Sequence, residues 1–329
     1  MRKLLAAAAT AALLGLTACG SGSLTSGEES ASASASGGAE GLTPIEVGVI
    51  PIVDVAPIYL GVQEGLFEDE GLDVTLTLAQ GGAAIVPAVT AGQMDFGFSN
   101  ITSMIVGRSK GLPVKMVAPG GSSTGDTDAD FASVMTLPDS GIKTVTDLAG
   151  KKVGVNTLNN ISDSTISEAV KQAGGDYESS EFVEIPFPEL SGQLAAGTVD
   201  AIAAVEPFVT IAGADGAVPV FSNYAEPVDD LTVAVYFTSD KYVQENPEIV
   251  EKFARAMNAS QEFAEQNPDK VRAVLPTYTS LEPAVIEQLT LPRYSTEVNR
   301  ASVEEVARIS QDRGLVEEQP NMDELLPQD

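Results

Sequence analysis

The side chains that could do chemistry in this chain are carboxylates, hydroxyls and amides. The sequence has 47 Asp and Glu residues, a single cysteine and no histidine. The absence of histidine excludes a Ser-His-Asp triad, a His zinc site and a His general base. One cysteine cannot make an intramolecular disulfide or a thiolate metal site. We therefore expect no catalytic residue, no metal and no cofactor, and a function that depends on binding.

Candidate ligand-binding residues follow the ends of expected strands, and several of them open the next helix. They are Asp54, Val55, Gln80, Gly81, Gly82, Ser99, Asn100, Ser122, Asn156, Asn159, Asn160 and Glu206. Free N–H groups at helix starts, hydroxyls and amides bind polar ligand groups, and the glycine pair at 81–82 would let a ligand approach the backbone closely. The structural alternatives are ordinary N-capping by Ser and Asn and a simple tight turn at the glycines.

The charges of these candidates favour one class of ligand. None of them is Lys or Arg, whereas Asp54 and Glu206 are carboxylates that suit N–H donors or a positive charge. We therefore expect a small N–H-bearing or neutral organic solute rather than a simple inorganic anion. Glu206 has a structural alternative as an acid in a helix first turn. Aromatic walls, or ordinary core, are expected from Phe98, Phe131, Phe208 and Tyr236.

Alternating strands and helices must position these residues. Strands are expected at 45–50, 72–78, 94–98, 114–118, 131–137, 152–155, 181–185, 199–203 and 231–238. Helices are expected at 56–64, 83–91, 101–110, 161–173 and 189–196, and beyond Asp240 the chain is expected to be helical to its end. Strands separated by helices predict βαβ units and mainly parallel sheets.

The pattern predicts an α/β fold of two similar lobes. Residues 91–97 and 196–202 each combine a helix end, an Ala-Gly stop and a strand start with Asp. Two crossing strands, near 131–137 and 231–238, would join the lobes and leave a ligand cleft between them. Residues 44–133 and 236–329 are assigned to lobe 1, which carries the C-terminal helices, and residues 134–235 to lobe 2.

The first 43 residues differ from the rest. A basic start, an apolar run at 4–16 and small residues before Cys19 are typical of a secretory signal peptide at 1–18. The run is too short to span a bilayer, which takes about 20 residues. Residues 19–43 are rich in Ser, Gly and Ala and are expected to form a flexible tether.

The end of this signal resembles the bacterial lipobox. Leu16-Thr17-Ala18-Cys19 has its pattern, and the resemblance implies that Cys19 is lipidated and becomes the mature N-terminus. The protein would then be extracytoplasmic, anchored by lipid to the outer face of the cell membrane, or periplasmic. A plain signal peptide that happens to contain a cysteine is the alternative.

The net charge limits the partners. The formal charge is −29 at pH 7, and such a chain repels nucleic acid and anionic lipid. We therefore expect no nucleic-acid partner, and we interpret the charge as a source of solubility. A single body on a tether needs no second copy, so a monomer is expected.

Several motifs together resemble a known family. They are PIYLG at 57–61, EGLF at 64–67, EGLDV at 70–74, GQMDFG at 92–97, DLAGKKVGV at 147–155, AVEPF at 204–208 and NPEIV at 246–250. From about Ile45 onward the chain resembles extracytoplasmic solute-binding proteins of ABC importers, in the nitrate/sulfonate/taurine and thiamine-precursor-like (NMT1/THI5-like) group.

The resemblance implies a periplasmic-binding-protein type II fold. It also implies a small nitrogen-containing or sulfonate-like ligand, captured by lobe closure and delivered to an ABC permease. A ligand-sensing lipoprotein that feeds a signalling receptor remains an alternative, as do a structural or adhesive lipoprotein and a carboxylate-based enzyme. The family's pyrimidine synthase uses histidine, which this chain lacks.

Overall fold

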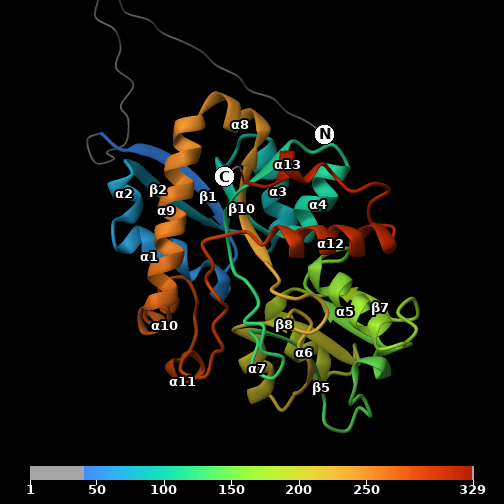
Figure 1. The fold of residues 1–329 in the computed structure, drawn as a ribbon. Coiled ribbons are helices and arrows are strands. Elements are labelled where there is room, and N and C mark those ends of the chain that lie inside the picture. The colour runs from blue at the N-terminus through green and yellow to red at the C-terminus, as the bar shows by residue number, and fades with distance from the viewer. Residues whose placement is uncertain (1–40, 328–329) are drawn as a thin grey trace, which may run out of the picture. The chain divides into compact units, whose positions relative to one another are not determined.

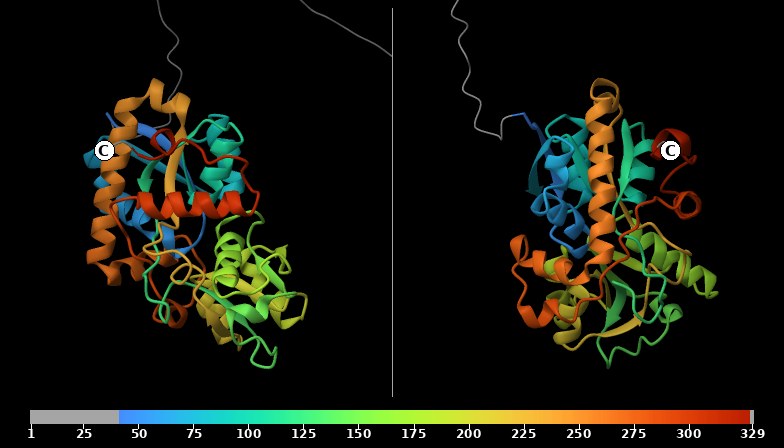
Figure 2. Two further views of the ribbon diagram at one scale, coloured as in Figure 1. Left: turned by 45° about the vertical axis from the view of Figure 1, so that its right-hand side comes forward. Right: turned by 60° about the vertical axis from the view of Figure 1, so that its left-hand side comes forward.

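The computed structural model describes residues 41–327. The predictions on the signal peptide, most of the tether and Cys19 lie outside the described residues. The described part forms two five-stranded sheets with helices packed around them (Figures 1 and 2). The two-lobed α/β fold expected from the alternating pattern is confirmed.

The first sheet has the strand order β2-β1-β3-β10-β4. Its strands are β1 (Thr43–Val49), β2 (Leu72–Leu78), β3 (Phe96–Asn100), β4 (Val114–Pro119) and β10 (Ala234–Ser239). β1 pairs in parallel with β2 and β3, and β10 runs antiparallel to β3 and β4. β1 begins at Thr43, which pairs with Leu72, so the sheet starts within the segment assigned to the tether.

The second sheet repeats this arrangement in the order β7-β6-β8-β5-β9. Its strands are β5 (Ala132–Thr136), β6 (Lys152–Val155), β7 (Glu181–Glu184), β8 (Ala201–Val205) and β9 (Val218–Phe221). β6 pairs in parallel with β7 and β8, and β5 runs antiparallel to β8 and β9. Each sheet therefore places one antiparallel strand in the fourth position. The similar segments 91–97 and 196–202 lead into β3 and β8, which both hold the third position of their sheets.

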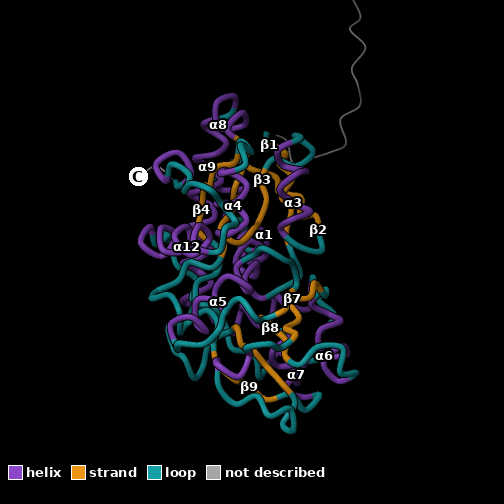
Figure 3. The backbone as a smooth tube through the Cα atoms, turned by 90° about the vertical axis from the view of Figure 1, so that its right-hand side faces the viewer, coloured by secondary structure: helices purple, strands orange, loops and turns teal. Residues whose placement is uncertain are grey.

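Two connections carry the chain between the sheets. The segment after β4 leads into β5, and the segment after β9 returns to β10 (Figure 1). Figure 3 shows β1 to β4 in the upper part of the molecule and β7, β8 and β9 in the lower part. These crossing segments pair with each other: Ser123 N donates to Leu231 O at 2.9 Å, and Val233 N donates to Gly121 O at 3.0 Å. The two expected crossing strands thus lie inside the sheets, and the loops before them make the crossing.

Helices and short 3-10 turns fill the connections. The helices are α1 (Ala56–Gln63), α2 (Leu66–Asp69), α3 (Gly82–Thr90), α4 (Ile101–Ser109), α5 (Ile161–Gln172), α6 (Leu190–Ala195), α7 (Phe208–Ala214), α8 (Asp240–Glu245), α9 (Pro247–Gln266), α10 (Pro268–Val274), α11 (Pro283–Ile286), α12 (Arg300–Asp312) and α13 (Met322–Leu325). The 3-10 turns are Val53–Val55, Val145–Leu148, Phe187–Glu189 and Leu275–Thr277.

The period of two along β3 explains how helices cover both faces of the first sheet. Phe96 stacks on Phe253 of α9, with ring centroids 3.9 Å apart. The next residue, Gly97, faces the other way, because a Cβ there would lie 2.3 Å from Ile85 of α3. The α3 helix therefore packs directly against the backbone on one face, and α9 supplies aromatic core on the other.

The expectation of helix from Asp240 to the end is wrong in part. Residues 287–299 form no helix. Instead, Arg293 pairs with Ser122: each residue's backbone N–H donates to the other's C=O at 3.0 Å. The segment around Arg293 therefore lies beside the two crossing segments. Its partner Ser122 is far away in the sequence, so no local pattern could indicate this pairing.

Candidate ligand-binding site

A cavity lies between the two lobes, where strands of both sheets end. Its volume is about 40 Å³. Its wall contains Ile50, Ile52, Asp54, Phe98, Asn100, Asn156, Asn160, Ile161, Phe187, Val205, Tyr224, Val233 and Ala234. Four candidates from the sequence meet here: Asp54, Asn100, Asn156 and Asn160. The cavity walls are mostly apolar, with a few amides and one carboxylate, which is the usual make-up of a small-molecule site.

Asp54 is the charged group of this wall. Its exposed fraction is 2%, and its Oδ2 atom has no hydrogen-bond partner. Burial raises the pKa of Asp54 to about 7, with a further contribution from nearby Asp130. A buried carboxylate oxygen without a partner is costly. A ligand N–H or a cation placed in the cavity would relieve that cost.

A second polar atom near Asp54 has no partner either. Tyr236 on β10 is fully buried, and its Oη atom makes no hydrogen bond. Burial raises the pKa of Tyr236 well above its usual value, and the charge of Asp54 adds to this. Two buried polar oxygens on the lobe 1 side of the site, one from Asp54 and one from Tyr236, are therefore left without hydrogen bonds by folding.

Tyrosines from the C-terminal part hold the segment that carries Asp54. Tyr278 Oη donates to Ile52 O at 3.1 Å, and Tyr294 Oη donates to Val53 O at 2.9 Å. On the other side, a Cβ at Gly121 would lie 2.8 Å from Asp54 Oδ1. The crossing segment thus approaches the carboxyl group as closely as a residue without a side chain allows.

In lobe 2, the loop before α5 is fixed by its own cap. Asn160 Oδ1 accepts from Ile161 N at 2.6 Å. The Asp163 carboxylate accepts from Asn159 N at 2.6 Å and from Asn160 N at 2.8 Å. Three backbone N–H groups around this helix start, those of Asn159, Asn160 and Ile161, are therefore already engaged, two of them by a carboxylate.

The lobes touch each other around the cavity. Asn160 Nδ2 donates to Ser103 Oγ of α4 at 3.2 Å. A Cβ at Gly81 would lie 3.6 Å from Thr157 Oγ1, so the turn before α3 meets the loop before α5. A ligand larger than the cavity therefore needs these contacts to part before it can enter.

Glu206 has another role in the structure. It is 2% exposed but does not line the cavity. Its carboxylate accepts from Thr210 N at 3.0 Å, Thr210 Oγ1 at 2.8 Å and Thr290 N at 3.2 Å. Burial raises its pKa, and these hydrogen bonds oppose the rise. These contacts agree with the structural alternative, an acid at a helix start, because both carboxylate oxygens accept hydrogen bonds at or near the start of α7.

Several other candidates also lie outside the cavity wall. Gly82 packs on Ser99, since a Cβ there would lie 2.1 Å from Ser99 Oγ. Ser122 joins the crossing segments. Val55 is buried beside α1, and Gln80 and Asn159 are exposed. Asn159 adopts a left-handed backbone, with φ of 54°, which orients its N–H towards Asp163.

The sequence prediction missed most of the apolar wall. Ile50 and Ile52 follow β1, Val205 ends β8, and Tyr224 lies in the second crossing segment. Phe187 also lines the cavity, and its ring stacks on Phe208 with centroids 5.3 Å apart. The sequence signal for such wall residues is an apolar side chain one to three positions after a buried strand, as at Ile50 and Ile52. The prediction considered mainly the polar residues at strand ends.

Asp130 ties the two crossing segments together. It accepts from Ser123 Oγ at 3.1 Å and from Thr124 N at 2.9 Å in its own segment. It also accepts from Ser222 Oγ, at the start of the other segment, at 3.0 Å. With an exposed fraction of 8%, this carboxylate is the main side-chain link at the crossing.

We predict that Asp130→Ala lowers the free energy of unfolding by about 2–4 kcal/mol, because it leaves several buried donors without an acceptor. Urea unfolding of the purified protein measures this loss. Asp128→Ala, in the same loop but exposed, is the matched control and should change stability little. Equal effects of the two substitutions would show that the link at Asp130 is not structural.

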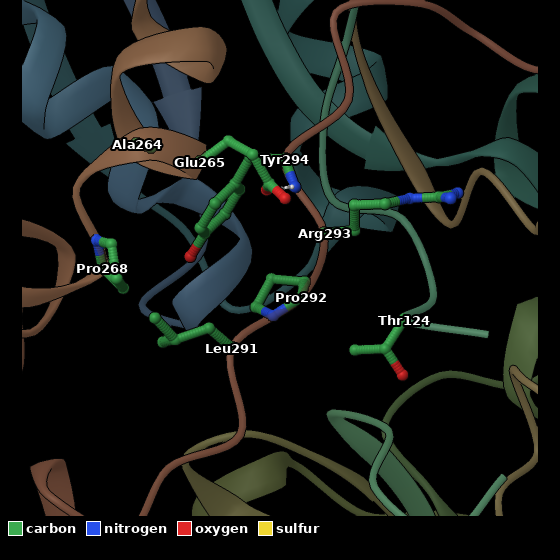
Figure 4. Close-up of a pocket in the computed structure, with 8 residues that line it drawn as sticks. All are labelled: Thr124, Ala264, Glu265, Pro268, Leu291, Pro292, Arg293 and Tyr294. Atoms are coloured by element: carbon green, nitrogen blue, oxygen red, sulfur yellow. Dashed lines mark hydrogen bonds between the residues drawn. The ribbon is translucent and has the colours of Figure 1, made fainter. Parts of the chain in front are cut away.

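A larger pocket, of about 330 Å³, is lined by Thr124 of the first crossing segment and by residues of the C-terminal part between 264 and 294. Figure 4 shows Thr124, Pro292 and Tyr294 around it, together with Glu265, whose Oε2 atom accepts from Tyr294 N at 2.8 Å. The buried hydroxyl of Tyr294 holds Val53, next to Asp54. This pocket therefore lies behind the ligand-binding segment and contains none of the residues predicted from strand ends.

Within residues 41–327, no helix is both long and apolar enough to cross a membrane. The same residues contain no group of three or more His, Cys, Asp or Glu side chains that could hold a metal ion.

Comparison with known protein families gives a match over most of the described chain. The family described as NMT1/THI5 like matches residues 52–271. A formylaminopyrimidine-binding protein of Halalkalibacterium halodurans is 28% identical over 67% of this chain, and the match spans 65% of that protein's length. A 4-amino-5-hydroxymethyl-2-methylpyrimidine phosphate synthase of Aspergillus parasiticus is 24% identical over 69% of this chain and 67% of its own.

Solved structures share the fold at low sequence identity. The ligand-binding component of an ABC-type import system from Staphylococcus aureus has a TM-score of 0.74 at 14% identity, covering 86% of this chain and 96% of that one. The periplasmic aliphatic sulphonate-binding protein SsuA of Escherichia coli has a TM-score of 0.71 at 17% identity, covering 87% and 92%.

Proposed function

We propose a function from the premise that this chain belongs to the NMT1/THI5-like family. The chain acts as a solute-binding receptor that captures a small organic molecule between its lobes and delivers it to an ABC permease. No bond is made or broken in this process. The family also contains pyrimidine synthases, but this chain has no histidine to serve as a general base.

The observation that carries the proposal is the unpaired carboxylate oxygen of Asp54 in a cavity wall without Lys or Arg. Such a wall favours a ligand that donates N–H bonds or carries a positive charge. The N–H groups of Asn159 and Asn160, just before α5, are already engaged by Asp163, which disfavours a sulfonate at these two groups. We therefore propose a small nitrogen-containing solute, in agreement with the name of the Halalkalibacterium relative.

In this proposal, ligand binding is coupled to lobe closure. Sites for small molecules usually enclose about 300–1,000 Å³, whereas this cavity has about 40 Å³. The lobes must therefore part to admit a ligand, and the ligand then favours the closed arrangement because only that arrangement lets both lobes touch it. The crossing segments, joined at Asp130, are the hinge for this motion.

We also propose the location from the leader sequence. Cleavage before Cys19 and lipidation of its thiol would hold the receptor outside the cytoplasm, close to its permease. A diacylglyceryl group and a further acyl chain hold a protein on a membrane stably, whereas one chain binds marginally. Mass spectrometry of the mature N-terminus decides this point, since an unmodified thiol at Cys19 would contradict it.

We predict that nitrogen heterocycles stabilise a soluble form of residues 38–329, which starts ahead of β1. The probes are formylaminopyrimidine, 4-amino-5-hydroxymethyl-2-methylpyrimidine, methylamine, nitrate and methanesulfonate. At 100 times its dissociation constant, a bound probe adds about 2.7 kcal/mol to the free energy of unfolding. A thermal-shift assay should show this as a rise of several degrees for a pyrimidine. Stabilisation by nitrate or methanesulfonate alone would contradict the proposed ligand class.

A further inference from the structure

The α12 helix lies along the seam between the lobes. It packs against α4 of lobe 1 and against α5 of lobe 2 (Figures 1 and 2). Its start is held at the second crossing segment, where Ser302 Oγ accepts from Thr232 N at 3.1 Å and Asn299 Nδ2 donates to Asp230 O at 2.8 Å. Its far end reaches the start of α5, beside the cavity.

Three ion pairs join this helix region to α5. They are Arg308–Glu168 at 2.8 Å, Lys171–Asp312 at 2.8 Å and Arg313–Asp163 at 2.9 Å. The Lys171–Asp312 pair is about 40% exposed on both sides. Arg308 also pairs with Glu305 and Asp312 on its own helix. Only Arg313–Asp163 is largely buried among these three, with side chains 15% and 2% exposed.

Asp163 is also the acceptor that shapes the lobe 2 loop. Its carboxylate holds the backbone N–H groups of Asn159 and Asn160. Asn160 lines the cavity and reaches Ser103 in lobe 1. One buried carboxylate therefore links the cavity wall, the contact between the lobes and Arg313, which comes from the C-terminal part of the chain.

Arg313 is held in place for this contact. Its Nη1 atom donates to Asp163 Oδ1 and to Ser164 Oγ, both at 2.9 Å. Its guanidinium carbon lies 5.7 Å from the ring centroid of Phe182. A guanidinium fixed by two hydrogen bonds and an aromatic face neutralises the buried charge, which would otherwise be left without compensation.

We propose, on the basis of the proposed function above, that Arg313 is a positioning residue for ligand binding. It pairs with the buried carboxylate of Asp163, which holds Asn159 and Asn160 so that Asn160 faces the cavity and contacts lobe 1. Ligand affinity is therefore set in part by a residue that touches no ligand and lies about 150 positions further along the chain.

The test compares Arg313→Met with Arg308→Met, a matched control that removes an ion pair to the same helix without touching the loop. Amide hydrogen exchange reports on Asn159 and Asn160, and calorimetry gives the dissociation constant for formylaminopyrimidine. Arg313→Met should speed exchange at these amides and weaken binding by about 10-fold, since it leaves a buried charge unpaired. Arg308→Met should change both by less than about two-fold, because its partners Glu168, Glu305 and Asp312 make no hydrogen bond to Asn159 or Asn160.

Further variants keep the test decisive. Arg313→Lys should recover part of the affinity, and in an Asp163→Asn background Arg313→Met should have little further effect, because the partner charge is gone. Equal effects of Arg313→Met and Arg308→Met would overturn the proposal, as would unchanged affinity with a loosened loop. If the wild-type protein binds no formylaminopyrimidine, the proposed ligand fails, while exchange at Asn159 and Asn160 still decides whether Arg313 positions the loop.

Discussion

Replacement of Asp54 by asparagine should make the protein more stable at pH 8 and a weaker binder at the same time. Burial raises the pKa of Asp54 from 3.8 to about 7 in the folded protein. The folded state therefore binds more protons than the unfolded state between these two values. The contribution of Asp54 to the free energy of unfolding is therefore highest below pH 4. This contribution falls as the pH rises from 4 to 7.

The size of this effect follows from the shift. About three pKa units correspond to about 4 kcal/mol, lost between pH 4 and pH 7. Asparagine has nearly the same shape and no charge to desolvate. Asp54→Asn should therefore remove this pH dependence and gain up to about 4 kcal/mol over the wild type at pH 8, a difference that shrinks as the pH falls towards 4.

Binding should change in the opposite direction. A hydrogen bond to a charged group is worth about 1.5–3 kcal/mol, so loss of the carboxylate should weaken the affinity for an N–H-donating pyrimidine by about 10- to 100-fold. Gained stability with lost affinity is the signature of a group kept for function rather than for folding.

Urea unfolding at pH 5 and pH 8, with calorimetry at pH 8, measures both changes. Asp139→Asn, at an exposed turn, is the control and should leave both unchanged. If Asp54→Asn and the wild type lose stability equally between pH 5 and pH 8, the carboxyl group of Asp54 is not the buried charge described above. If the substitution leaves affinity intact, Asp54 does not contact the ligand.

A disulfide that joins the two lobes should stop ligand entry. Gly81 in lobe 1 faces Thr157 in lobe 2, with 3.6 Å between a Cβ built at Gly81 and Thr157 Oγ1. Gly81 has an extended backbone, with φ of 176°, which any residue adopts. Cysteines at both positions would place their sulfur atoms within reach of each other.

The oxidised Gly81→Cys/Thr157→Cys protein should bind formylaminopyrimidine at least about 100-fold more slowly than its reduced form, because the lobes must part for entry. Stopped-flow binding before and after reduction measures this change. The only natural cysteine is Cys19, which the soluble form lacks, so no other thiol competes. The two single-cysteine variants are controls, and full-rate binding by the cross-linked protein would show that entry does not need the lobes to open.

Much of the fold could be predicted because its signals are local. The period of two in residues 72–78 and the Ala-Gly stops at 92 and 197 each depend on neighbours within a few positions. These signals located β2 and β6 at their observed bounds and β1, β3 and α5 within a few residues. They failed in residues 287–299, because the partner of Arg293 is Ser122, far away in the sequence.

The candidate site was predicted less well, for a physical reason. A polar residue at the end of a strand can cap the next helix or face a ligand, and both uses need the same residue types. Glu206 and Asp54 were equivalent as carboxylates in the sequence. In the structure, Thr210 and Thr290 engage Glu206, whereas one oxygen of Asp54 has no partner.

The sequence by itself determined the family and the alternation of strands and helices. It also excluded catalysis and zinc binding by histidine, because the chain has none. Only the tertiary structure decided which polar groups remain unsatisfied, because each hydrogen bond that engages a carboxylate requires two segments to meet. Thr290 meets Glu206 and Arg313 meets Asp163 across 84 and 150 positions. Because these long-range contacts engage Glu206 and Asp163, Asp54 remains the charged group of the cavity wall. No local sequence pattern contains that information.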